Sequence, residues 1–253
     1  MFTEERTSEI EKILHQDGKV LVKELSEHFH VTDDCIRKDL KNLENKGRLK
    51  RTYGGAILSQ DYPLDRAVID RRDFHIDQKR IIAKKAVEMI QEKETVFLDI
   101  STTNIELAKE ISALKKEITV VTNMLDILEI LMLNKRITLI GTGGTMHSEV
   151  NGFMGIATAQ AIKNYSFDKA FLGTTGIAMT DGAITTLGAE DGLTKKAVIE
   201  SSRHTYIVME SEKFHYNDSY KYAHFDDISG IITDVVPDKS IVDALKAADV
   251  ALF

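Results

Sequence analysis

The sequence predicts a two-part α/β protein, with a small N-terminal winged helix-turn-helix domain followed by a larger α/β domain. The first part is predicted by two short amphipathic helical patterns on either side of a tight break at His30 and Val31, followed by a glycine-bearing hairpin pattern. The second is predicted by apolar segments of helical period that alternate with short β-branched runs from residue 76 onwards. We place the domains at residues 3–58 and 77–253, with a linker at 59–76.

The elements of the first domain follow from capping and turn residues. Thr3 suits the N-cap of the first helix and Gly18 its end, and Thr32 suits the N-cap of the helix after the break. Gly54 and Gly55 can adopt positive φ and therefore turn a hairpin. The expected elements are a helix at 4–16, a strand at 20–22, a helix at 23–28, a helix from 33 to a stop at Gly47, a hairpin wing at 49–58 and a linker helix near 67–74.

The helix that begins after Thr32 has an apolar stripe and a basic face. Apolar residues recur at i, i+4 and i+7 and are predicted to face the core, namely Ile36, Leu40 and Leu43. Basic residues then point to solvent, namely Arg37, Lys38 and Lys41. Residues 35–51 hold seven basic and two acidic side chains, although the whole chain has a net charge of -7. Such a local concentration of positive charge indicates an anionic partner.

Duplex DNA is the partner that we infer for this basic face. A major groove admits one α-helix, and Arg or Lys side chains can read guanine edges there while other cations hold phosphates. The alternative is a solvated basic face on an ordinary helix pair, which is what charge runs usually are. The residues expected at the DNA interface are Thr32, Asp34, Cys35, Arg37, Lys38, Lys41, Arg51 and Tyr53.

Many positions of this region match the N-terminal signature of a known family at fixed spacing. The matching residues are Arg6, Ile10, Leu14, Gly18, Val20, Val22, Glu24, Leu25, Phe29, Val31, Ile36, Arg37, Asp39, Leu40, Leu43, Glu44, Gly47, Arg51, Gly54, Gly55 and Ala56. This run resembles the DeoR family of bacterial transcriptional regulators, and the resemblance implies a DNA-binding domain. The sequence departs from the family's usual residues at four positions, with Cys35 for Thr, Lys38 for Arg, Arg48 for an apolar residue and Tyr53 for His.

Composition is that of an ordinary globular protein, with 43% hydrophobic and 29% charged residues. The acidic start MFTEERTSEI lacks the apolar centre of a signal peptide, and charges interrupt every apolar run well short of a membrane span. The single cysteine, Cys35, excludes an internal disulfide and is consistent with a reducing cytoplasm. We therefore expect a cytoplasmic protein without a membrane partner.

Alternating strands and helices in the second domain indicate a largely parallel sheet. The expected helices lie at 78–90, 104–112, 124–133, 157–162, 191–201 and 239–247, and the expected strands at 95–99, 118–121, 136–140, 169–172, 205–208 and 230–232. In open α/β sheets, ligands bind beyond the carboxyl ends of the strands. Loops rich in small polar residues follow four of the predicted strands, at 99–104, 122–123, 141–145 and 173–176.

The first of these loops predicts a phosphate site. Ser101, Thr102 and Thr103 open a helix whose N–H groups and dipole favour an anion. The alternative is that these hydroxyl groups only cap their helix, as single Ser and Thr residues usually do. Three in a row exceed what a cap needs, so we favour phosphate.

The same loops extend the DeoR resemblance over nearly the whole chain. FLDISTT is similar to the family's Asp-x-Gly-Thr-Thr loop, with Ser101 in place of Gly, and SEKF resembles its Ser-Ser-Lys-Phe segment, with Glu210 where Asp is usual. The segments VVTN, GGT, AFLGTTGI and ITD also match. The resemblance implies a domain similar in fold to ribose-5-phosphate isomerase that binds a phosphorylated sugar or sugar-like effector. The residues expected to bind it are Asp99, Ser101, Thr102, Thr103, Asn123, Gly143, Gly144, Gly173, Thr174, Gly176 and Lys213.

A sugar-phosphate isomerase with an added DNA-binding domain is the alternative function. Such an enzyme needs a positioned carboxylate base, and the loop at 171–176 contains no acidic residue. Glu190 and Asp191 lie nearby in sequence, but acids at the start of a helix more often stabilise its dipole. His28, His30 and Cys35 lack the spacing of a zinc site. We therefore expect no catalytic residue, no bound metal and no cofactor.

Together with the predicted DNA-binding head, the DeoR resemblance implies a repressor of a sugar or sugar-alcohol catabolic operon that is relieved by a phosphorylated sugar effector. One small DNA-binding domain makes few contacts, and two-fold dimers are the commonest assembly, so we expect a homo-oligomer, either a dimer or a tetramer. A third possibility is a DNA-binding protein whose second domain only oligomerises, in which case no ligand would shift its melting temperature.

Overall fold

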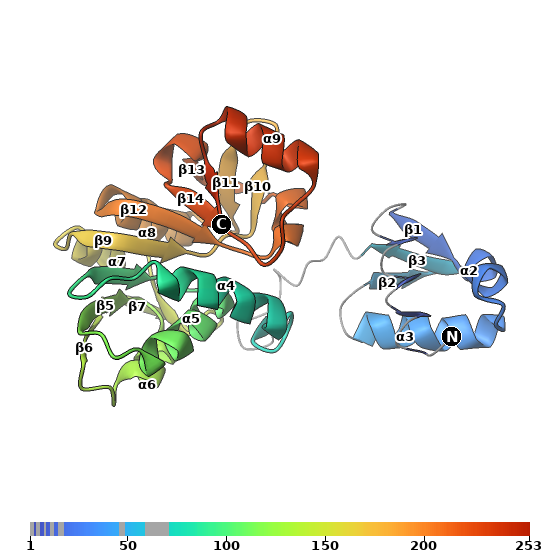
Figure 1. The fold of residues 1–253 in the computed structure, drawn as a ribbon, viewed down its shortest axis with the longest axis horizontal. Helices are drawn as coiled ribbons and strands as arrows, with labels where there is room; N and C mark the ends of the chain where they lie inside the picture. Colours follow the sequence, from blue (N-terminus) through green and yellow to red (C-terminus); the bar gives the residue numbers. More distant parts are fainter. Residues whose placement is uncertain are drawn as a thin grey trace. The chain divides into compact units, whose positions relative to one another are not determined.

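The computed structural model describes residues 3, 6–7, 9–10, 13–14, 18–45, 49–58 and 71–253. The chain forms two compact units, Met1–Asp65 and Arg66–Phe253, which are called the head and the body below. The head is built around one hydrophobic core and the body around two, and Figure 1 shows the elements of both units.

The head combines helices with a three-stranded antiparallel sheet of order β1-β3-β2. Its elements are β1 (Lys19–Leu21), α2 (Val22–Phe29), α3 (Asp33–Asn45), β2 (Leu49–Thr52) and β3 (Gly55–Leu58). The described residues between 3 and 14 are helical, in agreement with the first predicted helix, whose two ends lie outside the described residues. The predicted stripe of Ile36, Leu40 and Leu43 is buried in the core of the head, which confirms the orientation of α3.

The break between α2 and α3 is made by local backbone geometry. His30 adopts the left-handed conformation with φ 54°, and the N–H groups of His30 and Val31 bond to carbonyls in the last turn of α2. Thr32 accepts a hydrogen bond from the Cys35 N–H at 3.3 Å, which confirms it as the N-cap of α3. The predicted stop at Gly47 lies outside the described residues.

The wing hairpin differs from the prediction in the role of one glycine. Gly54 has φ 87° and turns the chain, as expected, but Gly55 already belongs to β3 and does not have positive φ. A Cβ at Gly55 would lie 2.0 Å from the Val20 carbonyl oxygen on the neighbouring strand. Gly55 is therefore required because β1 approaches it closely, which the sequence pattern could not reveal.

The body is built on a parallel seven-stranded sheet of order β15-β14-β12-β9-β4-β5-β6. Its strands are β4 (Thr95–Leu98), β5 (Ile118–Thr122), β6 (Ile137–Gly141), β9 (Phe167–Leu172), β12 (Ser202–Val208), β14 (Gly230–Ile232) and β15 (Ala251–Leu252). The helices are α4 (Ile76–Glu88), α5 (Thr102–Ala113), α6 (Leu125–Leu131), α7 (Ile156–Ile162), α8 (Ala189–Glu200) and α9 (Lys239–Ala247). The predicted α/β fold class is confirmed.

Helices cover both faces of this sheet (Figure 1). One core contains residues of α4, α5 and α6, and the other contains residues of α7, α8 and α9. Along β4, Val96 and Leu98 belong to the first core and Phe97 to the second, because successive side chains of a strand point to opposite faces. The carboxyl ends of the strands are consequently held in fixed positions by two packed layers.

Several short elements of the body were not predicted. They are β7 (Thr145–His147), β8 (Gly152–Met154), β10 (Gly176–Ala178), β11 (Ala183–Thr186), β13 (Tyr220–His224), η3 (Ser211–His215) and η4 (Phe225–Asp227). Runs of three to five residues are too short to show a period of two, so only pairing with other segments defines them.

The linker helix predicted near 67–74 is wrong in its described part, because residues 71–74 contain no α-helix.

Candidate functional site

A cavity of about 410 Å³ opens at the carboxyl ends of β4 and β9 in the body. In the sheet, β5 and β6 extend from one edge of β4, and β9 pairs with the opposite edge of β4. The direction in which strands are added therefore reverses between β4 and β9. Ligand sites of open α/β sheets occur at such reversal points. The lining residues are Arg71, Ile100, Ser101, Thr102, His147, Glu149, Val150, Met154, Gly173, Thr174, Thr175, Thr186, Leu187, Gly188, Ala189, Glu190, Asp191, Lys195 and Lys213.

The N-terminus of α5 reaches this cavity through Ser101 and Thr102. The Ser101 hydroxyl accepts a hydrogen bond from the Asn104 N–H at 3.2 Å and caps the helix. The first turn of α5 contains no acidic residue, so the positive end of its dipole is open to an anionic ligand. Thr103 is only 2% exposed and does not line the cavity.

Lys195, which lines the cavity, forms a buried ion pair with Asp99 behind the lining. Asp99 also accepts a hydrogen bond from the Gly173 N–H at 3.1 Å, and Lys195 Nζ lies 3.4 Å from Asp191 Oδ2. Burial raises the pKa of Asp99 to about 6. Burial acts to lower the pKa of Lys195, but Asp191 and Asp99 outweigh this effect and raise it. Lys195 is therefore a charged side chain that two carboxylates already compensate.

A second buried ionic cluster surrounds Lys213. Lys213 Nζ donates to the Thr174 carbonyl at 3.0 Å and lies 3.2 Å from Glu210 Oε2. Lys79 of α4 donates to the Arg71 carbonyl at 2.7 Å and is 2% exposed. Burial acts to raise the pKa of Glu210, but the charges of Lys213 and Lys79 lower it to about 2. Burial lowers the pKa of Lys79 itself to about 8.

The N-terminus of α8 brings acidic side chains to the same cavity. Glu190 and Asp191 both lie in its first turn, and Asp191 accepts a hydrogen bond from the Thr186 hydroxyl at 2.5 Å. Glu190 Oε2 lies 3.5 Å from His147 Nε2, and Glu149 is a further acidic lining residue. The cavity therefore contains two helix N-termini of different charge.

The structure brings together some of the predicted ligand-binding residues and separates others. Those that line the cavity are Ser101, Thr102, Gly173, Thr174 and Lys213. Those outside its lining are Asp99, Thr103, Asn123, Gly143, Gly144 and Gly176. Two of these glycines are explained by close packing, since a Cβ at Gly144 would lie 2.1 Å from Thr158 Oγ1 and one at Gly176 2.0 Å from the Tyr216 carbonyl oxygen.

Sequence reasoning missed two cations of the cavity, Lys195 and Arg71. Lys195 follows Asp191 by one helical turn, so the acidic start of α8 could have pointed to it. Its partner Asp99 is 96 positions away in the chain, and no local pattern links the two residues. Arg71 lies in the segment predicted as a linker, where nothing in the sequence singled it out.

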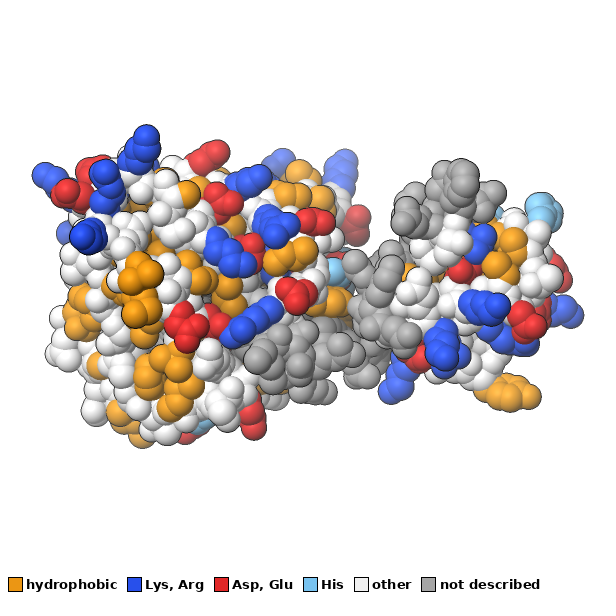
Figure 2. All heavy atoms as spheres, turned by 90° about the horizontal axis from the view of Figure 1, so that it is seen from below, with side chains coloured by type: hydrophobic (Ala, Val, Ile, Leu, Met, Phe, Trp, Pro, Cys, Tyr) orange, Lys and Arg blue, Asp and Glu red, His pale blue; other side chains and the backbone are white. Residues whose placement is uncertain are grey.

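The predicted DNA interface of the head is accessible to a partner. Thr32, Asp34, Arg37, Lys38, Lys41, Arg51 and Tyr53 are exposed and Cys35 is half-buried. Arg37 Nη1 lies 2.9 Å from Asp34 Oδ1, and Arg51 Nε lies 2.7 Å from Glu44 Oε2. In Figure 2, Lys and Arg side chains appear beside acidic ones on the visible face of the head. These exposed ion pairs are weak, so both arginines can exchange partners for phosphates or base edges.

A buried ion pair joins the first helical segment of the head to α3. Arg6 Nε donates to Asp39 Oδ2 at 2.6 Å, and both side chains are less than 10% exposed. The Asp39 carboxylate raises the pKa of Arg6 by hydrogen bonding. Because Asp39 lies on the inner side of α3, the pair helps to orient the basic residues of that helix outwards.

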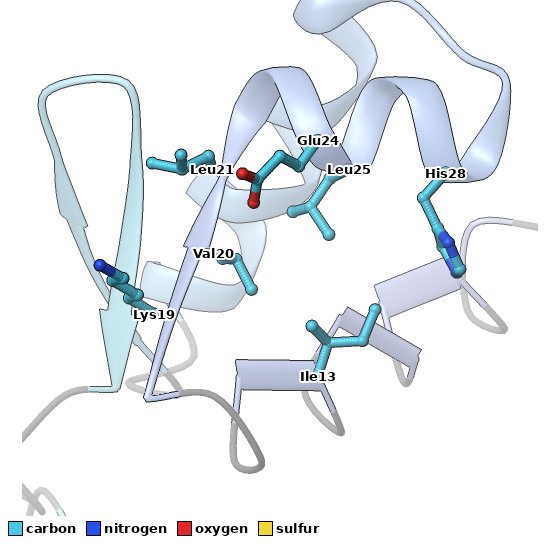
Figure 3. Close-up of a pocket in the computed structure, with 7 residues that line it drawn as sticks. All are labelled: Ile13, Lys19, Val20, Leu21, Glu24, Leu25 and His28. Carbon is cyan, nitrogen blue, oxygen red and sulfur yellow. The ribbon is translucent and has the colours of Figure 1, made fainter.

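The head also has a small groove of about 210 Å³ (Figure 3). Ile13, Val20 and Leu25 form its apolar floor, and Lys19, Leu21, Glu24 and His28 complete its lining. No described residue of α3 or of β2 lines this groove, so it is distinct from the basic face.

None of the described helices is long and apolar enough to cross a membrane. Within the same residues, no group of three or more His, Cys, Asp and Glu side chains is arranged to hold a metal ion.

Two family models match this chain. Residues 6–61 match the DeoR-like helix-turn-helix domain, and residues 74–235 match the DeoR C terminal sensor domain.

Curated relatives match over nearly the full chain. The glycerol-3-phosphate regulon repressor of Escherichia coli (strain K12) is 31% identical over 95% of this chain and 94% of its own length. The lactose phosphotransferase system repressor of Staphylococcus epidermidis is 30% identical over 91% of both chains. The HTH-type transcriptional repressor GlcR of Bacillus subtilis (strain 168) is 29% identical over 100% of this chain and 96% of its own length.

Solved structures also resemble this chain, at low sequence identity. eIF2B delta from Chaetomium thermophilum is 12% identical with a TM-score of 0.50, over 81% of this chain and 64% of that one. Ribose 5-phosphate isomerase A from Methanocaldococcus jannaschii is 15% identical with a TM-score of 0.41, over 55% of this chain and 54% of that one.

Proposed function

This chain belongs to the DeoR family of DNA-binding transcriptional regulators, and we propose that it represses a sugar or sugar-alcohol operon until a phosphorylated sugar binds the cavity of the body. The relatives' names support this proposal, because they include repressors for glycerol-3-phosphate and lactose systems. The effector, the operator and the direction of control are inferred for this chain from those names and from the geometry of its site.

The observation that carries the proposal is the uncompensated N-terminus of α5 at the cavity. Ser101 and Thr102 present hydroxyl groups there, and Lys213 adds an ammonium group to the lining. A phosphate group can accept hydrogen bonds from the N–H groups of the first helical turn and from these side chains. We infer that this end of the cavity binds the effector phosphate. Gly173 lets the loop at Ser101 pack closely against the end of β9, since a Cβ there would lie 2.5 Å from Ser101 Cβ.

Operator recognition is assigned to α3 and the wing. Arg37, Lys38 and Lys41 project from the face of α3 opposite its buried stripe, and Arg51 and Tyr53 are exposed on the wing. A helix presented in this way can enter a major groove while the wing cations contact phosphates. We infer that two heads of a homodimer bind two half-sites, because a single small head buries too little surface for specific binding.

We infer that the cavity binds the sugar phosphate and does not convert it into another compound. An isomerase would need a carboxylate base beside the substrate carbonyl. Asp99 is held by Lys195 and Gly173, Asp191 is held by Lys195 and Thr186, and Glu190 is 64% exposed at the side chain. The carboxylates closest to the strand ends are thus engaged in structural contacts, and the relatives are named repressors.

A thermal-shift screen of the full chain against aldose, ketose and polyol phosphates tests the proposal, with each unphosphorylated compound as its control. A true effector raises the melting temperature only when phosphorylated. The hit is then titrated into a complex of the protein with duplex DNA from upstream of its operon, where it should weaken binding. Absence of any phosphate-dependent shift refutes the effector proposal, and conversion of a sugar phosphate into its isomer supports the enzyme alternative instead.

A further inference from the structure

The two helix N-termini that meet the cavity differ in their own charge. The first turn of α5 has no acidic residue, whereas the first turn of α8 holds Glu190 and Asp191. Glu149 extends the acidic side, because it also lines the cavity, and the imidazole of His147 lies beside Glu190 with its Nε2 3.5 Å from Oε2. The lining therefore has one end at the N-terminus of α5, where the helix dipole is unopposed and Lys213 lies paired with Glu210, and an acidic end at α8.

This asymmetry determines where an anion can bind. At α5 the positive end of the helix dipole is unopposed, so a phosphate gains from it. At α8 the two carboxylates already compensate the dipole, and a second anionic group would meet them at close range. Hydroxyl groups of a ligand can instead donate hydrogen bonds to Glu149 and Glu190, whose ionised oxygens only accept.

The contact between Lys195 and Asp191 does not neutralise the acidic end of the cavity at α8. Lys195 lies 3.4 Å from Asp191, but the same Nζ group is bound to the fully buried Asp99. One ammonium group thus faces two carboxylates. Glu190 has only His147 near its carboxylate among the ion pairs described, and its side chain is 64% exposed towards solvent.

From this geometry we propose that the cavity selects compounds with one phosphate group and an uncharged, hydroxyl-bearing far end, and that it discriminates against bisphosphates and phosphorylated carboxylic acids. The proposal rests on the effector site assigned above and adds a rule for its ligands. The acidic end of the cavity, formed by Glu149, Glu190 and Asp191, is the specificity determinant.

Matched pairs of ligands test this rule on the full chain by calorimetric titration. Fructose 6-phosphate is compared with fructose 1,6-bisphosphate, and glycerol 3-phosphate with 3-phosphoglycerate, together with any hit of the phosphate screen and its bisphosphate. In each pair that binds, the compound with an uncharged far end should bind at least about fivefold more tightly than the compound with a second anionic group. A factor of this size corresponds to one extra like-charge contact in water. Equal or tighter binding of the bisphosphates overturns the rule, whereas absence of binding by every compound overturns the effector site itself.

Two variants locate the effect in the named side chains. Glu190→Gln and Glu149→Gln should each lower the ratio of monophosphate to bisphosphate affinity by roughly threefold or more, because each removes one negative charge without changing shape. Glu200→Gln is the matched control, since Glu200 is at the far end of α8 and lies 3.1 Å from Lys163. Melting curves verify that all three variants fold. An affinity ratio that falls equally in the control, or in none of the variants, overturns the assignment.

Discussion

Glu210 allows a quantitative test of the ionic cluster beside the cavity. It is 1% exposed, lies 3.2 Å from Lys213, and the charges of Lys213 and Lys79 hold its pKa at about 2 against the effect of burial. The ordinary value is 4.5. A depression of this size corresponds to about 3 kcal/mol of folding free energy, at roughly 1.4 kcal/mol per pKa unit.

We predict that Glu210→Gln lowers the free energy of unfolding at pH 7 by about 3 kcal/mol, since both lysines lose their carboxylate. The pKa of Glu210 is lower in the folded chain than in the unfolded chain, so its stabilising effect is complete above pH 4.5 and is lost as the pH falls towards 2. The stability difference between wild type and variant should therefore shrink across that interval.

Urea denaturation at pH 7, 5, 4 and 3 measures this difference, with Glu88→Gln on the exposed side of α4 as the control. The control should follow the wild type at every pH. A difference between wild type and Glu210→Gln that stays constant from pH 7 to pH 3 would show that the carboxylate charge is not what stabilises the cluster.

Four further outcomes are expected. Arg37→Ala should weaken operator binding by about 1 to 3 kcal/mol in a fluorescence-anisotropy titration at fixed salt, and leave the effector's thermal shift unchanged. Thr102→Ala, which removes a hydroxyl group from the cavity, should weaken effector binding by calorimetry about tenfold, whereas Thr103→Ala, outside the lining, should mainly lower the melting temperature. Gly55→Ala should abolish operator binding but keep the effector's thermal shift, because its Cβ would strike the Val20 carbonyl oxygen in the head. Light scattering should give a dimer or tetramer, and a monomer with a footprint on one half-site would contradict the assembly.

Local pattern was enough to predict the helices of the head and most of the large elements of the body. The stripe of Ile36, Leu40 and Leu43 defined the inner face of α3, and its basic face followed from helical geometry alone. The strand and helix at 230–232 and 239–247 were placed at their observed bounds. The hydroxyl groups predicted at the start of α5 include two, on Ser101 and Thr102, that line the cavity of the body.

The remaining features depend on segments that are distant in the chain. Ser101 and Lys213 meet at one cavity because β4, which precedes Ser101, and β12, which precedes Lys213, both pair with β9 in the sheet. The ion pair of Asp99 with Lys195 of α8 likewise joins residues that are 96 positions apart in the chain. By itself, the sequence determined the family, the head with its basic helix and the α/β order of the body, because caps and periodicity act over one or two turns. Only the tertiary structure decided which charges share the cavity and which are neutralised, because that depends on strand order and burial, and neither leaves a local pattern.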